Sequence, residues 1–305
     1  MESRLMELSR ELADLTNQAS QSVVVVEGRR RMYSSGVHWR KNLIVTAEHT
    51  VRRDEDITVV LPTGKRSHAK LVGRDPGTDI ALLQGDSFDL PVANSNASVD
   101  IRAGEIALVV GRSPNSGPNV SMGIISAVSG PWRTWRGGNL EKYIRLDADV
   151  FLGSSGGAVV NHEGKNIGIA TTVLSRVAGL AIPSTSIDKV VDVLLKHGTV
   201  PRGYIGVGLQ QVPLPDSLLK KLSIQSSRGL MVFSVEPSGH AEAGGILIGD
   251  ILLQVNGKSI ASVEDLQSML TQDTIGKSLK VKAIRGGEIK EIAVTVGERG
   301  QGGKT

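Results

Sequence analysis

Three short segments each place a polar residue at the end of an apolar run, and together they contain the residue types of a nucleophilic site. His49 follows the segment Leu43–Thr46, Asp79 precedes an apolar run, and Ser155 lies in the glycine-rich turn Gly153–Gly157. Each segment alone is a common turn or strand end. A serine hydroxyl becomes a nucleophile when an imidazole takes its proton and a carboxylate orients that imidazole. The three segments in this order therefore predict nucleophilic catalysis by Ser155.

The glycines around Ser155 suit the second requirement of such chemistry. They allow a tight backbone turn in which the N–H groups of Gly153 and Ser155 can point at one oxygen atom. Two N–H donors aimed at one point stabilise the negative charge that develops during attack on a carbonyl.

The elements that must position these residues are mostly strands. From about residue 20, short Val/Ile-rich runs alternate with turn signals at roughly ten-residue spacing, which predicts an antiparallel barrel or sandwich. A helix is expected to close this region, because Ile187, Val190, Val191 and Leu194 follow the 3.6-residue period and Gly198 ends it. A second unit is expected over 202–297, with strands at 205–209, 230–235, 251–255, 280–285 and 289–296 and helical patterns at 240–244 and 263–270.

An amphipathic helix is expected over residues 1–19. Met1, Leu5, Leu8, Leu12 and Leu15 are spaced 4, 3, 4 and 3 residues apart, with charged residues between them. The stripe suits either a helix packed on its own domain or the seam of an oligomer.

Composition excludes several classes of function. The 305 residues include 35 Lys or Arg and 31 Asp or Glu, a net charge of +4, which does not indicate a nucleic-acid partner. There is no cysteine, so disulfides, thiolate catalysis and Cys-based metal sites are excluded. No His/Asp/Glu cluster has metal-ligand spacing, and we expect no metal or other cofactor. Neither a signal-peptide core nor a transmembrane segment is apparent.

Longer motifs identify a family. The segments Thr46–His49 and Gly153–Gly157 resemble those of chymotrypsin-like serine proteases, and Asp75–Leu83 narrows the resemblance to the HtrA (Deg) family. Tyr204–Val207 and Gly249–Gly257 resemble the PDZ domain of that family. The resemblance implies a mainly β protein: a double β-barrel protease domain with its active site between the barrels, followed by a PDZ α+β domain. The expected divisions are a helix at 1–19, the protease domain at 20–198, the PDZ domain at 199–297 and a disordered tail at 298–305.

The resemblance also implies roles for individual residues. Ser155 would be the nucleophile, His49 the general base and then acid, and Asp79 the orienting carboxylate, with Gly153 and Ser155 forming the oxyanion hole. The chain departs from the family pattern before the nucleophile. The family usually has Asn and Pro where Ser154 and Leu152 stand, and Phe151 also replaces a frequent Asn.

Two residues are expected at the pocket for the substrate side chain before the scissile bond, the P1 residue. In trypsin-like proteases the residue six positions before the nucleophile forms the pocket floor, and Asp149 stands there. A buried carboxylate would select Lys or Arg, whereas the family prefers aliphatic P1 residues and Val173 on the pocket wall would block a long side chain. The third alternative is that Asp149 is a solvated loop residue.

The PDZ resemblance predicts a peptide-binding loop. Backbone N–H groups around Tyr204, Ile205, Gly206 and Val207 would hold the terminal carboxylate of a peptide that adds a strand to the sheet. Gly206 would allow the carboxylate to approach the backbone closely. The alternative is a vestigial module that only packs on the protease domain.

The sequence thus predicts an ATP-independent serine endoprotease of protein quality control, which cleaves misfolded or unstructured polypeptides while its PDZ domain binds peptide C-termini or hydrophobic segments. The alternative is a proteolytically inactive, peptide-binding scaffold or holdase. The resemblance further implies a homotrimer, and a location in the periplasm or cell envelope. If Met1 is the native start, the chain would be cytoplasmic.

Overall fold

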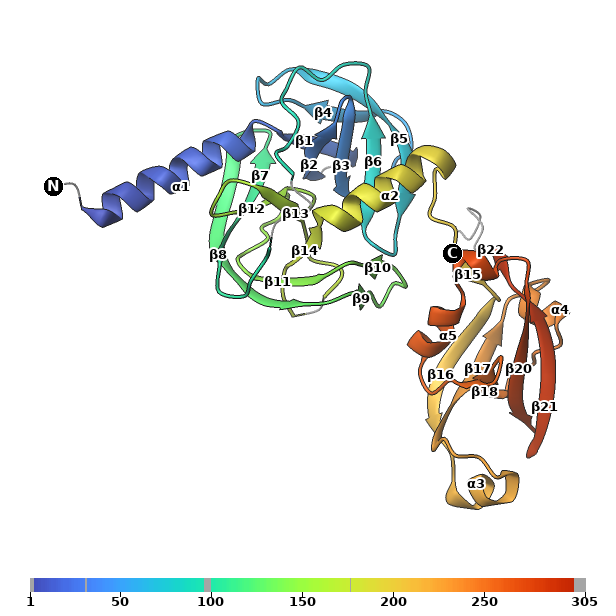
Figure 1. Ribbon diagram of the computed structural model, residues 1–305. Helices are drawn as coiled ribbons and strands as arrows, with labels where there is room; N and C mark the ends of the chain where they lie inside the picture. The colour runs from blue at the N-terminus through green and yellow to red at the C-terminus, as the bar shows by residue number, and fades with distance from the viewer. Residues whose placement is uncertain (1–2, 31, 96–99, 176, 299–305) are drawn as a thin grey trace. The chain divides into compact units, whose positions relative to one another are not determined.

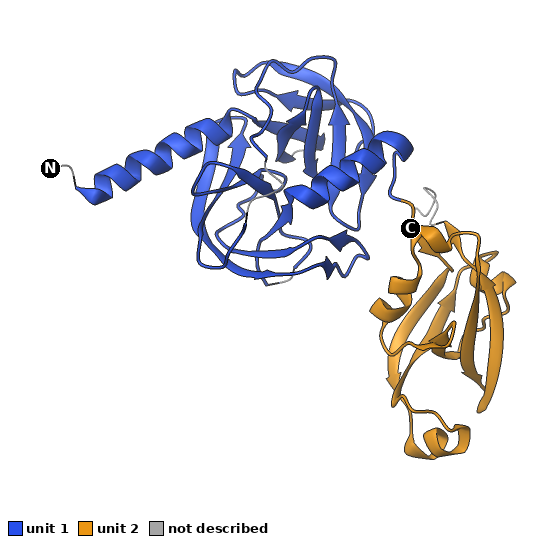
Figure 2. Ribbon diagram, viewed as in Figure 1, with its two compact units in different colours: residues 1–200 blue, residues 201–305 orange. Residues whose placement is uncertain are grey.

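The computed structural model describes residues 3–30, 32–95, 100–175 and 177–298. The chain divides into two compact units, Met1–Val200 and Pro201–Thr305 (Figure 2). Strands β1 to β14 (residues 23–183) belong to the first unit, whose last helix ends at His197.

Two closed six-stranded barrels make up most of the first unit (Figure 1). The double β-barrel expected from the sequence is confirmed. The first barrel has the strand order β1-β2-β3-β6-β5-β4, with bounds β1 Val23–Arg29, β2 Met32–Arg40, β3 Leu43–Ala47, β4 Ile57–Val60, β5 Arg66–Asp75 and β6 Ile80–Gln84. The second has the order β11-β14-β13-β12-β7-β8, with β7 Ile106–Ser113, β8 Gly117–Ser129, β11 Tyr143–Asp147, β12 Ala158–Asn161, β13 Asn166–Thr171 and β14 Leu180–Pro183. A small hairpin, β9 Trp132–Arg133 and β10 Asn139–Leu140, precedes β11.

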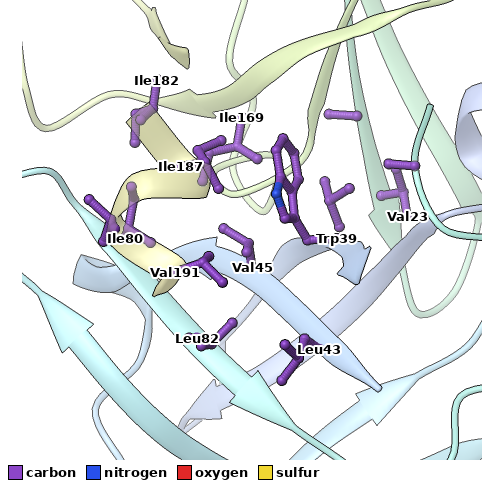
Figure 3. Packing of buried hydrophobic residues seen from close by; sticks show 14 of the residues in the cluster. Val23, Trp39, Leu43, Val45, Ile80, Leu82, Ile169, Ile182, Ile187 and Val191 are labelled. Carbon is purple, nitrogen blue, oxygen red and sulfur yellow. The ribbon is translucent and has the colours of Figure 1, made fainter. Parts of the chain in front are cut away.

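The barrels are held together by a shared core. Strand β3 is buried on both faces: Ile44 packs in a cluster drawn from the first barrel, whereas Val45 packs in a second cluster that draws on both barrels. Helix α2 (Ser184–His197) covers this second cluster, in which Figure 3 shows Ile187 and Val191 beside Val45. Alternate residues of one strand thus serve two cores, which explains its continuous apolar run.

Helix α1 spans Arg4–Ser20 and begins where the Ser3 hydroxyl accepts the Leu5 N–H. Only its second half packs on the barrels, through Leu12 and Leu15. Leu5 is 77% exposed and Leu8 is 42% exposed. The packing of the second half agrees with a helix that lies on its own domain. The alternative role, as the seam of an oligomer, stays a prediction.

The second unit is built on one antiparallel sheet in the order β16-β17-β18-β20-β21. Its strands and helices are β15 Gly203–Tyr204, β16 Val207–Pro213, α3 Asp216–Leu222, β17 Arg228–Val235, α4 His240–Ala243, β18 Ile251–Val255, β19 Lys258–Ser259, α5 Val263–Met269, β20 Ser278–Arg285, β21 Glu288–Thr295 and β22 Gly297–Glu298. The strand expected at 205–209 begins instead at Val207, because the chain turns at Gly206 with φ +78°. Glu298, the first residue of the expected tail, pairs with Gly203, and 299–305 lie outside the described residues.

Within the part of the chain that the structure describes, no helix is both long and apolar enough to cross a membrane.

Candidate active site

His49 and Asp79 meet at the ends of two neighbouring strands of the first barrel. His49 lies in the short 3-10 helix Glu48–Thr50 directly after β3, and Asp79 directly precedes β6, the neighbour of β3. The His49 Nδ1 atom lies 3.0 Å from Asp79 Oδ1 and 2.9 Å from Oδ2, and the His49 backbone N–H donates to Oδ1 at 2.9 Å. This carboxylate therefore fixes both the ring and the backbone of His49.

Asp79 is fully buried and is held in a strained backbone conformation, with φ at +59°. Its Oδ2 accepts a hydrogen bond from the Thr171 hydroxyl at 2.5 Å, and its carbonyl accepts the Glu48 N–H at 3.1 Å. Thr171 ends β13 of the second barrel. The carboxylate is thus supported from both barrels, and the sequence reading missed Thr171.

Ser155 is held beside these residues by its turn. The Ser155 carbonyl accepts the Ser35 N–H at 3.1 Å, and the Gly156 N–H donates to the Ala170 carbonyl at 2.8 Å. A Cβ on Gly156 would lie only 2.7 Å from the Ala47 nitrogen, two residues before His49. Because Ala170 immediately precedes Thr171, β13 contacts both the Ser155 turn and Asp79. The structure therefore brings together all three of the predicted segments.

The turn before Ser155 takes a backbone conformation that glycine favours at Gly153. Gly153 has φ +90°, and its carbonyl accepts the Ser35 hydroxyl at 2.7 Å, which directs that oxygen into the protein. Among the described residues, the N–H groups of Gly153 and Ser155 find no acceptor. Tyr33 packs against Gly153, where a Cβ would lie 2.4 Å from the ring.

A second buried carboxylate, Glu48, lies next to His49 and is 6% exposed. Burial raises the pKa of Glu48, and the nearby Asp79 raises it further, whereas Arg74, Arg136 and Arg52 lower it without reversing the shift. The sequence offered one signal for this residue, because Glu48 directly follows the apolar strand β3 (Leu43–Ala47).

The two residues predicted for the P1 pocket differ in burial. Asp149 is exposed, and its carbonyl accepts a hydrogen bond from the Ser121 hydroxyl. Val173 is half-buried, and its carbonyl accepts the Trp135 indole N–H at 3.0 Å. A Cβ on Gly179 would lie 2.7 Å from a methyl carbon of Val150, the residue after Asp149.

The predicted peptide loop in the second unit lies between β15 and β16. Ile205 is buried, and its carbonyl accepts the Ala241 N–H at 2.7 Å, while the Gly206 carbonyl accepts the Glu236 N–H at 2.9 Å. Their own N–H groups have no acceptor within the described chain. Strand β16, which starts at Val207, forms one edge of the sheet, and α5 contacts it.

The described residues contain no group of three or more His, Asp or Glu side chains that could hold a metal ion.

Comparison with known protein families agrees with both units. The trypsin-like peptidase domain matches residues 34–169, and the PDZ domain matches residues 203–296. Among curated relatives, the periplasmic serine endoprotease DegP of Escherichia coli K12 is 33% identical over 258 residues, which cover 81% of this chain and 53% of DegP. A DegP-like periplasmic serine endoprotease of Halomonas elongata is 31% identical, over 89% of this chain and 57% of the relative. The chain thus spans about half the length of the curated relatives it matches.

Solved structures match most of the chain. The crystal structure of the serine endoprotease from Yersinia pestis is 32% identical, with a TM-score of 0.72 over 94% of this chain and 98% of that one. The HtrA-type protease AlgW with a decapeptide is 28% identical, with a TM-score of 0.71 over the same shares. A resemblance that includes the protease fold, the PDZ domain and nearly the full length of a solved relative shows that this chain belongs to the HtrA family of serine endoproteases.

Proposed function

We propose that the chain is an ATP-independent serine endoprotease that acts through Ser155, His49 and Asp79. The observation that carries this proposal is the pairing of His49 Nδ1 with a fully buried Asp79, at 2.9 Å, beside the turn that holds Ser155. An aspartate in this position keeps the proton on Nδ1, which leaves Nε2 as the base that faces the nucleophile.

The proposed reaction follows from these roles. His49 Nε2 takes the hydroxyl proton as Ser155 Oγ attacks the scissile carbonyl. The resulting oxyanion accepts hydrogen bonds from the backbone N–H groups of Gly153 and Ser155. The imidazolium, stabilised by Asp79, then gives its proton to the leaving amine, and an acyl-enzyme remains on Ser155. Water, deprotonated by the same imidazole, hydrolyses this ester and regenerates the hydroxyl.

We further propose an aliphatic preference at P1. Asp149 is exposed, and a solvated carboxylate exerts a weak, screened attraction on a basic side chain. Val173 and Val150 are half-buried, and both side chains are apolar. If Asp149 selected basic residues instead, Asp149→Ala would abolish cleavage after Lys and Arg. Under the present proposal, a cleavage-site profile shows aliphatic P1 residues in both proteins.

The PDZ unit is proposed to bind peptide C-termini or hydrophobic segments. Ile205 and Gly206 present N–H groups without partners at the start of β16, an edge strand. A peptide can add a strand at that edge while its carboxylate accepts these donors. Loss of binding in Gly206→Ala, measured with a fluorescent peptide, would support this loop as the site.

The proposed substrates are misfolded or unstructured polypeptides, because a chain must be extended to reach a turn held between two barrels. The relatives are named as periplasmic proteases, and we propose the same location and a homotrimeric assembly for this chain. Light scattering tests the assembly: a stable species near 32 kDa, the mass of one chain, would contradict a trimer.

Digestion of unfolded casein separates the proposed function from its rival, an inactive peptide-binding scaffold or holdase. The wild-type chain should degrade casein without ATP, and Ser155→Ala should not, although both bind the same peptides. If neither digests casein while both bind peptides and suppress its aggregation, the scaffold reading is correct.

A further inference from the structure

Ser35 forms hydrogen bonds to the turn that carries the nucleophile, although the proposed mechanism gives it no role. It lies in β2, and its side chain is fully buried. Its hydroxyl donates to the Gly153 carbonyl at 2.7 Å, and its backbone N–H donates to the Ser155 carbonyl at 3.1 Å. These are the two residues whose own N–H groups are proposed to bind the oxyanion. A single residue of the first barrel therefore holds the carbonyl groups of both.

Strands of both barrels fix Ser35 in turn. Its carbonyl accepts a hydrogen bond from the Thr46 hydroxyl of β3 at 2.6 Å. Its hydroxyl oxygen accepts the backbone N–H of Arg112, a residue of β7 in the second barrel, at 2.9 Å. A serine hydroxyl has one proton to donate. Because the Arg112 N–H approaches this oxygen as a donor, the Ser35 proton is left for the Gly153 carbonyl.

The side chain of Arg112 continues from this contact to the N-terminal helix. The residue is 7% exposed, and it donates from Nε to the Val23 carbonyl at 2.7 Å and from Nη2 to the Ser20 carbonyl at 2.6 Å. Ser20 ends α1 and Val23 begins β1, and Figure 1 shows this end of α1 beside β7. No basic residue lies in the last turn of α1. Arg112 therefore supplies the positive charge that stabilises a helix C-terminus.

Arg112 makes these contacts without a carboxylate partner among the described residues. Burial lowers the pKa of its guanidinium, but an arginine stays charged at neutral pH. A buried charge that is satisfied by backbone carbonyls depends on where those carbonyls lie. Movement of the junction between α1 and β1 would therefore displace Arg112, whose N–H orients Ser35.

The turn depends on this support because Gly153 does not fix its own shape. A glycine has no Cβ to restrict its backbone, and Gly153 has φ +90°. Gly153 is buried, and the described residues offer its carbonyl no donor besides the Ser35 hydroxyl. Without that hydroxyl, the carbonyl would find a partner only if the turn rotated. Rotation would also move the adjacent N–H groups away from the point where an oxyanion forms.

We infer that Ser35 is a positioning residue, which holds the Gly153–Ser155 turn in the form that binds an oxyanion, and that Arg112 couples Ser35 to the end of α1. This inference rests on the proposed proteolytic function, because an oxyanion forms only if Ser155 attacks a carbonyl. It extends that function, since the seating of the N-terminal helix then sets how well the oxyanion is stabilised.

Steady-state hydrolysis of a fluorogenic peptide by the full chain tests the role of Ser35. In Ser35→Ala, kcat should fall about 10- to 100-fold, because loss of one oxyanion donor costs about 100- to 1,000-fold and a loosened turn loses part of that. KM should stay within about twofold, since the oxyanion forms only in the transition state. Ser34→Ala is the matched control and should keep the wild-type kcat, because the buried Ser34 hydroxyl donates to the Val26 carbonyl in the first barrel.

Arg112→Met tests the coupling to α1. It removes both side-chain donors but keeps the backbone N–H, so kcat should fall less than in Ser35→Ala. Arg112→Lys keeps the charge and should recover part of the loss. When Ser35→Ala and Arg112→Met are combined, kcat should stay close to that of Ser35→Ala alone, because one residue acts through the other. Losses that multiply would contradict the coupling. Arg145→Met is the control, because Arg145 is half-buried in the same barrel and donates to the Ser126 hydroxyl.

A readout that needs no catalysis separates the inference from the proposed function. Gly153–Ser154 is the one place in the sequence where a serine follows a glycine. Labelling with carbonyl-13C glycine and 15N serine therefore gives one NMR signal that joins the two labels, and its 13C shift reports the hydrogen bond to the Gly153 oxygen. The signal should move upfield in Ser35→Ala and stay in place in Ser34→Ala.

The two readouts give distinct outcomes. If the wild type has no peptidase activity, the proposed function fails, and a carbonyl signal that moves in Ser35→Ala and in Arg112→Met still supports the positioning roles. If the signal does not move in Ser35→Ala, or if the folded variant keeps kcat within about twofold of the wild type, the inference is wrong. Thermal unfolding shows whether each variant is folded. Ser35→Cys, which keeps a weaker donor, takes the place of Ser35→Ala if alanine prevents folding, and its kcat and signal should change in the same directions.

Discussion

The hydrogen bond from Thr171 to Asp79 offers a direct test of how the two barrels cooperate. The variant Thr171→Val keeps the shape of the side chain but removes the hydroxyl that donates to Asp79 Oδ2 at 2.5 Å. Asp79 is fully buried, so no water can replace the lost donor. Hydrogen bonds to charged groups contribute about 1.5–3 kcal/mol. If that stabilisation is expressed in the transition state, when the imidazolium forms, kcat/KM should fall by about 10- to 100-fold.

The assay is steady-state hydrolysis of a fluorogenic peptide, with active-site titration to count folded enzyme. Thr171→Ser is the matched control, because it restores the hydroxyl and should recover most of the activity. Thermal unfolding shows whether Thr171→Val remains folded. A Thr171→Val enzyme that stays within twofold of the wild type would refute the reasoning, since Asp79 would then need no support from the second barrel.

Four further outcomes are expected. Gly153→Ala should lower kcat at least 100-fold while the fold persists, because its φ of +90° and the Tyr33 ring exclude a Cβ and displace the N–H donor; single-turnover kinetics measure this loss. Burial and Asp79 raise the pKa of Glu48, so the folded state favours its protonated form, and stability falls as pH rises. Glu48→Gln should therefore unfold at a higher temperature than the wild type at pH 8, and scanning calorimetry should show the difference vanish near pH 4. Burial alone would raise the pKa of Asp250, but hydrogen bonds from Arg285 and the Leu247 N–H outweigh it and lower the pKa. Asp250→Asn should lower the unfolding temperature of the PDZ unit by roughly 10 °C at pH 7, and the difference should disappear as pH falls below the lowered pKa. Gly206→Ala should weaken peptide binding about tenfold, because Gly206 has φ +78° and an added Cβ would lie 2.8 Å from Glu236 Oε2; fluorescence anisotropy measures it.

The parts of the site that the sequence could predict are those carried by local motifs. His49, Asp79 and Ser155 each follow or precede an apolar strand, and strand ends can be read within a few residues. The residues that hold them come from distant segments: Thr171 lies 92 positions from Asp79, and Ser35 lies 118 positions from Gly153. No local pattern encodes such a contact.

The difference between local sequence patterns and contacts between distant segments also decides which parts of the fold could be predicted. Most strands were predictable from Val/Ile-rich runs, because each run fills a core. The helix α3 (Asp216–Leu222) was not predicted, because it spans only 7 residues and its leucines, although they lie on one face, are only partly buried. The strand expected at 205–209 was displaced by Gly206, whose positive φ breaks the extended backbone. Backbone geometry at one glycine thus outweighed the apolar pattern around it.

The unfavourable features of the first unit gather where its barrels meet. Asp79 has a positive φ and a buried charge, and Glu48 is a second buried carboxylate. Each feature costs stability, and each persists only if its surroundings leave no alternative. The separate cluster inside each barrel and the shared cluster under α2 supply that constraint. A site assembled from both barrels can therefore hold strain that neither barrel would hold alone, and contacts such as Thr171 to Asp79 transmit the rigidity of one barrel to the charged groups of the other.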